Sequence, residues 1–359
     1  MHYLDHNASS PLRPEARAAM ERALSTVGNP SSVHRAGRAA RHVIEDAREQ
    51  IAALAGVKAR NVIFTSGGTE SNALALRGAV EGSLESGERI TRLFVSAIEH
   101  ESVLKTVSAL VERIPGLRLE IIPAAATGVA DLSATTLREG KGRALIAMMA
   151  ANNETGVVQP VESVEGLLFV DAVQRPDAYD NASYVSLSAH KIGGPQGVGA
   201  LIVRDDAPFS AQLLGGGQER GLRAGTENVA GIAGFGAAAA AWTIMSTNLR
   251  DRFEAGLPAS AVIFGRNSLR VPHTSNFALP DVSAETSVMA LDLDGVMVSS
   301  GSACSSGKVK PSHVLKAMGT SDEIARCALR VSFGWNSTEA DVDAALASIG
   351  RLVVRREAA

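Results

Sequence analysis

Lys191 is the residue whose setting most strongly indicates chemistry. It ends an apolar, strand-like run, with Ser188 and His190 just before it and Gly193 just after. An amine in a segment otherwise poor in charge loses solvation, which lowers its pKa and makes it a usable nucleophile. The alternative is a surface lysine at the end of a strand. The neighbouring serine, histidine and glycine favour a functional site.

A second apolar run, residues 167–170, ends in Asp171, and Gln174 follows three residues later. A carboxylate at the C-terminal end of a buried parallel strand faces the usual ligand crevice of such sheets. Beside a pyridine nitrogen, Asp171 would keep that nitrogen protonated, and Gln174 could hydrogen-bond the ring hydroxyl oxygen. The alternative for Asp171 alone is a helix cap after a strand, which is common. With Lys191, which can form an imine, and nearby hydroxyl groups for a phosphate, Asp171 suggests a pyridoxal-phosphate site.

Gly67-Gly68-Thr69 opens a predicted helix directly after a predicted strand. Free N–H groups and the helix dipole converge on an anion at such a position, and Thr69 adds a hydroxyl. An ordinary strand-to-helix turn with a threonine cap is the better explanation of this tripeptide alone. The tripeptide supports a phosphate site only together with Lys191 and Asp171.

Cys304 lies in residues 299–307, where seven of nine residues are Gly or Ser. Such a composition predicts a flexible loop, and a cysteine there can reach a substrate and react as a thiolate. Nearby Lys308 and Lys310 favour the anion modestly. Cys327 has apolar neighbours, which indicates packing.

Two further residues remain open between a site and a structural role. Arg330 lies in a predicted strand and needs a partner, either a substrate carboxylate or a structural ion pair. His100 precedes a predicted helix, where it could stack on a cofactor ring, shuttle protons, or simply begin the helix.

The elements that position these residues alternate. Strands are expected at 61–65, 93–96, 117–122, 144–149 and 198–203, with helices after Gly68 and from about Glu101. This pattern predicts an α/β fold with a mostly parallel sheet. The short connection from Lys191 to Val198 predicts a local antiparallel pair. Ser31 or Ser32 is expected to cap a long helix that includes Val33 and stops at Gly56.

After about residue 245, shorter strand candidates mix with helices, which indicates a smaller α+β domain. We therefore expect an N-terminal segment, 1–15, associated with that small domain, a large domain at 16–245 and the small domain at 246–359.

Composition limits the function classes. Hydrophobic residues are 45% and charged residues 20% of 359, so a sizeable core is expected. A net charge of −3 offers no electrostatic case for nucleic acid or an anionic membrane. The start lacks a signal-peptide pattern and only two cysteines are present, which predicts a cytoplasmic protein without disulfides. We predict no metal site.

Several ordered motifs together resemble the NifS/IscS-type cysteine desulfurases, which are class V aminotransferase-like pyridoxal-phosphate enzymes. The resemblance runs from Tyr3 to about Trp335. The motifs that carry it are 28–34 (GNPSSVH), 65–72 (TSGGTESN), 99–101 (EHE), 152–156 (NNETG), 170–174 (VDAVQ), 188–191 (SAHK), 215–228 (GGGQERGLRAGTEN) and 300–304 (SGSAC).

The resemblance implies the large and small domains of fold type I transferases and a role for each matching residue. Lys191 would bind the aldehyde of pyridoxal 5′-phosphate as an imine and move the substrate proton. Cys304 would accept sulfur from L-cysteine as a persulfide. The expected cofactor contacts are Gly68, Thr69, His100, Asp171, Gln174, Ser188 and His190, and the expected carboxylate contacts are Asn153 and Arg330. Thr226 would reach the phosphate of a partner subunit, which implies a homodimer.

The chain departs from this family in the segments 160–166 and 175–183, which look short, so the helix layer on one sheet face is expected to be thin. The setting of Cys304 resembles the group with the longer catalytic loop. A class V aminotransferase, a selenocysteine lyase or a catalytically weak assembly subunit remain alternatives. The sulfur acceptor could be an iron–sulfur scaffold or a thiolation protein.

Overall fold

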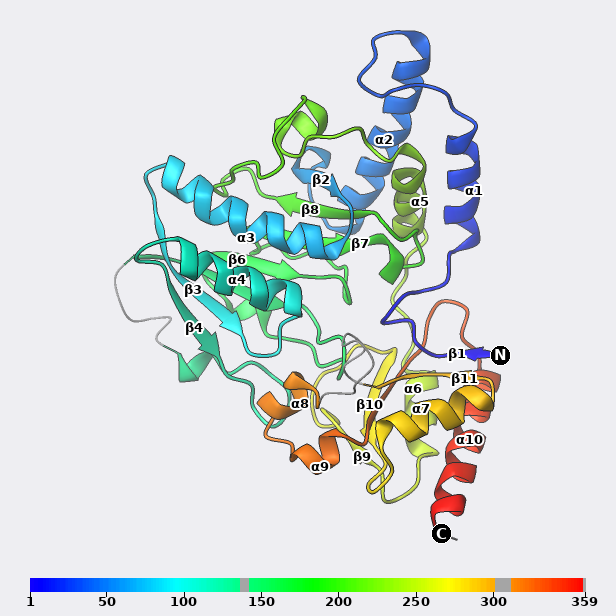
Figure 1. Ribbon diagram of the computed structural model, residues 1–359. Helices are drawn as coiled ribbons and strands as arrows, with labels where there is room; N and C mark the ends of the chain where they lie inside the picture. Colours follow the sequence, from blue (N-terminus) through cyan, green and yellow to red (C-terminus); the bar gives the residue numbers. More distant parts are fainter. Residues whose placement is uncertain (136–141, 301–310, 358–359) are drawn as a thin grey trace.

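Two sheets with their own helices build the protein in this computed structural model, which describes residues 1–135, 142–300 and 311–357 (Figure 1). The larger sheet has seven strands in the order β2-β8-β7-β6-β5-β3-β4. In chain order they are β2 (Val62–Thr65), β3 (Ile90–Ser96), β4 (Arg118–Ile122), β5 (Arg143–Met149), β6 (Leu167–Asp171), β7 (Tyr184–Ser188) and β8 (Gly199–Val203).

Only β8 runs against its neighbours, so the predicted antiparallel pair of β7 and β8 is confirmed within a mostly parallel sheet. The connection between β7 and β8 is too short to contain a crossover helix, so β8 returns antiparallel beside β7.

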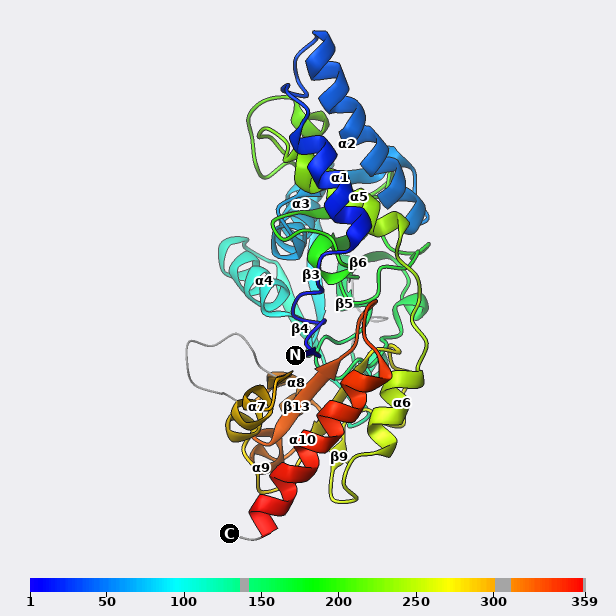
Figure 2. The same ribbon diagram turned by 90° about the vertical axis from the view of Figure 1, so that its right-hand side faces the viewer.

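Helices cover both faces of this sheet (Figure 2). One face carries α3 (Gly68–Glu85) and α4 (Glu101–Arg113), and the other carries α1 (Pro14–Leu24), α2 (Arg35–Leu54) and α5 (Val229–Ala240). Side chains of strand β3 contribute to the hydrophobic cores on both faces of the sheet. Leu93 and Val95 join the core under α3 and α4, whereas Phe94 joins the core on the opposite face. Alternate residues of a strand point to opposite faces, so a strand with two covered faces is apolar throughout.

The predicted cap of α2 was wrong. The helix begins at Arg35, and His34 is its N-cap, with Nδ1 accepting the Gly37 N–H at 3.2 Å. Val33 is 87% exposed and lies outside the helix. The imidazole satisfies the free donor that a serine would otherwise bond. The end was predicted correctly, since Gly56 follows the last turn with φ +64°.

The thin helix layer over β5 and β6 is confirmed. Residues 160–166 form only the 3₁₀ turn η3 (Val161–Ser163), and no helix forms in the described segment 175–183. Tyr179 and Ala182 from that segment are buried against the sheet instead. Asn181 donates from Nδ2 to the carbonyl oxygens of Val161 and Val164 at 2.8 and 3.0 Å. A loop held by these hydrogen bonds therefore covers this face of the sheet in place of a helix.

The second sheet has four strands in the order β12-β13-β10-β9, and a parallel pair of short strands, β1 and β11, lies beside it. Their bounds are β1 (His2–Tyr3), β9 (Val262–Ile263), β10 (Thr274–Ala278), β11 (Val296–Met297), β12 (Ser299–Ser300) and β13 (Ala328–Ser332). Its helices are α6 (Asn248–Ala255), α7 (Ala284–Leu293), α8 (His313–Ala317), α9 (Asp322–Ala325) and α10 (Glu339–Glu357).

The N-terminal segment runs from this second sheet to α1 and passes the larger sheet on the way (Figure 1). Asp5 bridges to Ser332, and the Ser10 N–H donates to the carbonyl of His190 at 2.7 Å. The expected division of the chain at residue 245 stays a prediction. Within the described part of the chain, no helix is long and apolar enough to cross a membrane.

Candidate active site

Most of the predicted site residues meet at the C-terminal edge of the parallel strands. Asp171 ends β6 and Ser188 ends β7, while the N-termini of α3 and α4 reach the same edge after β2 and β3. His100 is the N-cap of α4, with Nδ1 accepting the Ser102 N–H at 3.1 Å. Parallel strands present their carboxyl ends together, so the fold converts scattered sequence positions into one site.

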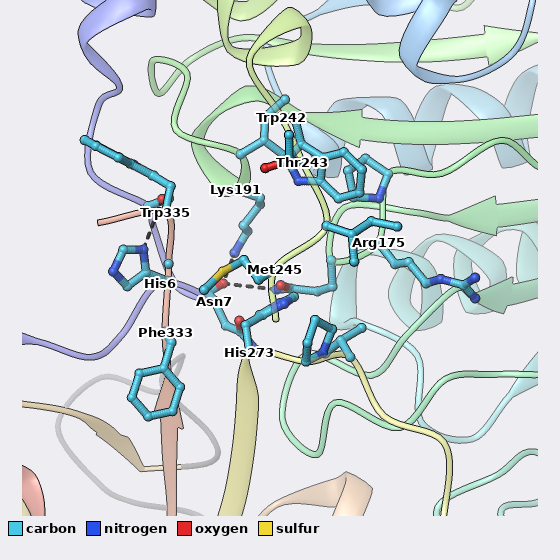
Figure 3. A pocket seen from close by; sticks show the side chains of 18 of the residues that line it. His6, Asn7, Arg175, Lys191, Trp242, Thr243, Met245, His273, Phe333 and Trp335 are labelled. Atoms are coloured by element: carbon cyan, nitrogen blue, oxygen red, sulfur yellow. Dashed lines mark hydrogen bonds between the residues drawn. The ribbon is translucent and has the colours of Figure 1, made fainter. Parts of the chain in front are cut away.

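Lys191 lies in the short turn η4 (Ala189–Lys191) that follows β7. Its Nζ donates to the carbonyl oxygens of Asn7 at 2.5 Å and Ala8 at 3.1 Å. Gln174 Nε2 donates to the same Asn7 carbonyl at 3.0 Å. Figure 3 shows the lysine side chain directed at Asn7 and the N-terminal segment. The backbone of that segment therefore holds the amine at the site.

Asp171 is a desolvated carboxylate, only 4% exposed. Its Oδ2 accepts from Asn72 Nδ2 at 2.7 Å, and its Oδ1 accepts from the Val173 N–H at 3.2 Å. Burial raises the pKa of Asp171, against the opposing effects of these hydrogen bonds and of the charges on His100 and Lys191. A buried carboxylate of this kind gains most from a cationic or proton-bearing partner, such as a pyridinium nitrogen.

His100 is joined to Asp171 through two residues that sequence reasoning missed. Its Nδ1 lies 2.8 Å from Ser102 Oγ, and Asn72 Nδ2 donates to that same Oγ at 2.9 Å as well as to Asp171. Desolvation lowers the pKa of His100, which Lys191 also lowers and Asp171 raises. A neutral imidazole therefore flanks the carboxylate. The spacing gave one signal for Asn72, since it lies one helical turn after Thr69 and so on the same side of α3.

A cavity of about 330 Å³ lies at the N-terminus of α3. Its polar lining comes from Gly67, Gly68, Thr69, Ser188 and His190 among others. Ser188 Oγ is buried and has no hydrogen-bond partner among the described residues. We call this polar lining the cradle. A Cβ at position 68 would lie 3.0 Å from Val173 Cγ1 and 3.6 Å from Ser188 Cβ, so a larger residue there would crowd the side chain of Val173.

The donors of the cradle fit a phosphate group. The first turn of an 18-residue helix offers free N–H groups, and an orphaned buried hydroxyl needs an acceptor. Burial lowers the pKa of His190 to about 4, and the charge of Lys191 acts in the same direction. His190 thus serves as a neutral donor or acceptor. With Asp171 and Lys191 beside this cradle, the residues present fit pyridoxal 5′-phosphate.

Arg330 and Asn153 are also brought together, on the side of the second sheet. Arg330 Nη1 donates to the Asn153 carbonyl at 3.0 Å, and Nη2 donates to Asp5 Oδ1 at 2.6 Å. Its Nε is buried without a hydrogen-bond partner within the described ranges. The ion pair that sequence reasoning left open is therefore present, and a substrate carboxylate would share Arg330 with Asp5.

One predicted residue does not join this cluster, and another falls outside the part of the chain that the structure describes. Cys304 lies outside the described residues. Thr226 is exposed in the segment 213–228, and none of the described residues that line the cavity at α3 comes from that segment. Cys327, the other cysteine, is 6% exposed and packed in a core cluster with Leu315 and Val314, so the packing role predicted for it is confirmed.

A second cavity, of about 230 Å³, meets the site at Lys191 and Gln174 (Figure 3). Both tryptophans of the chain, Trp242 and Trp335, line it together with Met245. The segment that follows α5 brings Trp242 and Met245 to this place. Lys191 therefore lines this second cavity and directly follows His190 of the cradle.

Comparisons with known proteins agree with this geometry. The family model for aminotransferase class V matches residues 2–345. An IscS-like cysteine desulfurase of Mycobacterium tuberculosis is 39% identical, with 99% of this chain and 97% of the relative covered. A solved NifS-like protein superposes with a TM-score of 0.88 at 32% identity, covering 99% of this chain and all of the other. SspA, solved in complex with cysteine, gives a TM-score of 0.81 at 30% identity over 94% of this chain and 100% of that one. The chain therefore belongs to the class V aminotransferase family and, within it, to the cysteine desulfurases of the NifS/IscS type.

Proposed function

We propose that the protein takes sulfur from L-cysteine onto Cys304 as a persulfide and releases L-alanine. The observation that carries this proposal is the juxtaposition of Lys191, the buried Asp171 and a phosphate cradle at one sheet edge. The relatives are cysteine desulfurases, and the cofactor of the family is pyridoxal 5′-phosphate. When bound, this cofactor supplies an electron sink that stabilises negative charge at the substrate Cα.

Each residue of the site has a task in this proposal. Asp171 would hold a proton at the ring nitrogen of the bound cofactor, and Lys191 Nζ would hold its aldehyde and move the proton of the substrate Cα. The cradle residues Gly68, Thr69, Ser188 and His190 would bind its phosphate, while His100 and Gln174 would hold its ring. Arg330 and Asn153 bind the substrate carboxylate.

The sulfur step transfers one sulfur atom from the substrate to Cys304. It needs no external oxidant, because the substrate Cβ is reduced as the sulfur is oxidised. The Cβ–S bond of the substrate breaks, a bond forms between that sulfur and Cys304 Sγ, and alanine carries away the hydrogen that replaces sulfur. The described residues on either side of the Cys304 segment support this role. Ser299 pairs with Arg330 in the second sheet, and His313 Nε2 lies 3.0 Å from the carbonyl of Glu99, next to His100.

Partner and location complete the proposal. A homodimer would let the exposed Thr226 reach the phosphate of the partner subunit. A protein acceptor, such as an iron–sulfur scaffold or a thiolation protein, would then take the sulfur. A reactive cysteine that must stay reduced between turnovers suits the cytoplasm.

The test compares Cys304→Ser with Cys327→Ser, which removes the other, buried cysteine. We expect wild type and Cys327→Ser to gain one sulfur atom on the Cys304 peptide after incubation with L-cysteine, detected by mass spectrometry, and to release alanine. Cys304→Ser should keep the visible absorbance of the bound cofactor and lose sulfur transfer. Full sulfide release by Cys304→Ser would contradict the role of Cys304. An unchanged cofactor absorbance in Lys191→Ala would contradict the whole site.

A further inference from the structure

The segment 213–228, called here the 213–228 loop, is fastened to helices α3 and α2 by two arginine–glutamate pairs. Arg223 Nε and Nη2 donate to Glu70 Oε1 and Oε2 at 2.8 and 3.1 Å. Arg48 Nη1 and Nη2 donate to Glu219 Oε2 and Oε1 at 2.7 and 2.8 Å. Both pairs are bidentate, which fixes the orientation of the two side chains as well as their distance.

The first pair involves the cradle itself. Glu70 stands next to Thr69 in the first turn of α3 and lines the same cavity as Ser188. Its Oε2 also accepts the Ser66 N–H at 2.8 Å, which closes the turn around Gly67 and Gly68. Burial alone would raise the pKa of Glu70, but the hydrogen bonds from Arg223 and Ser66 hold this pKa below its ordinary value. Glu70 is therefore a charged carboxylate at the rim of an anion site.

An unpaired carboxylate in this position would repel a phosphate dianion and cancel part of the helix dipole. Arg223 removes that penalty, because its guanidinium neutralises Glu70 without occupying the cavity. Arg223 is absent from the residues that line the cavity, so it acts on a phosphate through Glu70.

The second pair, Arg48–Glu219, helps to hold the turn that positions Arg223. Glu219 and Arg220 adopt left-handed backbone conformations, with φ of 44° and 59°, which are unfavourable for residues other than glycine. Glu219 is 5% exposed and also accepts the Phe64 N–H at 3.0 Å. Arg220 Nη2 donates to the Val62 carbonyl at 2.8 Å. These bonds to the outer edge of β2 hold the strained turn, from which the chain proceeds directly to Arg223.

Other side chains of the same loop are exposed. Leu214 is 80% exposed, and Thr226, three residues after Arg223, is exposed as well. One short loop therefore joins the cradle of its own chain to the surface on which a partner subunit is proposed.

We infer that the Arg223–Glu70 pair sets the affinity of the cradle for a phosphate monoester dianion and so makes retention of the cofactor depend on the seating of the 213–228 loop. This inference rests on the proposed function, because the phosphate belongs to pyridoxal 5′-phosphate. Arg223 is a positioning residue in this scheme and has no contact with the reacting atoms.

The test uses full-length apoprotein and two probes, pyridoxal 5′-phosphate and pyridoxal, which lacks the phosphate. Dissociation constants are measured by absorbance for wild type, Arg223→Gln, Glu70→Gln and the double variant. We expect Arg223→Gln to weaken binding of pyridoxal 5′-phosphate about tenfold, the effect of a charge interaction of ordinary strength, and to leave pyridoxal binding nearly unchanged. Glu70→Gln should bind at least as tightly as wild type, and the double variant should recover most of the lost affinity.

The matched control is Arg60→Gln, which breaks an exposed arginine–carboxylate pair with Asp205 away from the cradle and should leave both constants unchanged. Sedimentation of each variant reports the oligomeric state. Equal weakening of both probes in Arg223→Gln, or a double variant as weak as Arg223→Gln, would overturn the inference. A wild-type protein that binds pyridoxal as tightly as its phosphate would instead overturn the proposed function.

Discussion

Glu154 is a buried acid beside the proposed substrate site, and its replacement by glutamine has a predictable effect on stability. The side chain is 4% exposed, and its Oε2 accepts from Ser312 Oγ at 2.5 Å. Burial raises the pKa of Glu154 from 4.5 to about 7, although Ser312 and the charge of Arg330 act in the opposite direction. Asn276 Nδ2 donates to the backbone carbonyl of Glu154, so both the side chain and the main chain of Glu154 are hydrogen-bonded.

The magnitude follows from the proton affinity. A tenfold change in that affinity corresponds to about 1.4 kcal/mol, so moving the pKa of Glu154 from 4.5 to about 7 corresponds to about 3 kcal/mol. The folded state binds the proton more tightly than the unfolded state. This contribution to stability is therefore fully present below pH 4.5 and is lost as the pH rises through about 7.

Urea unfolding of wild type and Glu154→Gln between pH 4.5 and 8 measures the effect, because the amide does not titrate. We expect the free energy of unfolding of wild type to fall by about 3 kcal/mol relative to Glu154→Gln over this range. Ser312→Ala removes a hydrogen bond that lowers the pKa, so it should move the loss to higher pH. A difference between wild type and Glu154→Gln that stays constant with pH would refute the reasoning, since Glu154 would then have the same pKa in both states.

Two more perturbations test the anchoring of the loop and of the cradle. Arg48→Met should cost about 3–5 kcal/mol in urea unfolding, because it leaves the buried Glu219 carboxylate without its guanidinium, and adding Glu219→Gln should recover part of this loss. A cost below about 1 kcal/mol for Arg48→Met would mean that Glu219 finds other solvation. Ser188→Ala should leave the stability of the apoprotein unchanged or slightly raised, since its hydroxyl lacks a partner among the described residues. It should weaken pyridoxal 5′-phosphate about tenfold without affecting pyridoxal, and equal effects on both probes would contradict a phosphate contact.

Local signals in the sequence were sufficient for much of the fold. Apolar runs and glycine turns predicted the strands that end in Asp171 and Ser188, and the short link after Lys191 predicted the reversed strand β8. The start of α2 was missed because a histidine side chain, rather than one of two nearby serines, satisfied the first turn. A cap depends on a choice between neighbouring donors and acceptors that periodicity does not make.

The sequence by itself determined which side chains could do chemistry, since Lys191, Asp171 and Ser188 sit at strand ends that neighbouring residues specify. Only the tertiary structure decided which groups hold them. The pairs Arg330–Asp5, Asn72–Asp171 and Arg223–Glu70 join segments far apart in the chain. Their formation depends on how strands and loops converge at one sheet edge, and the energy of a buried charge depends on surroundings that no local pattern contains.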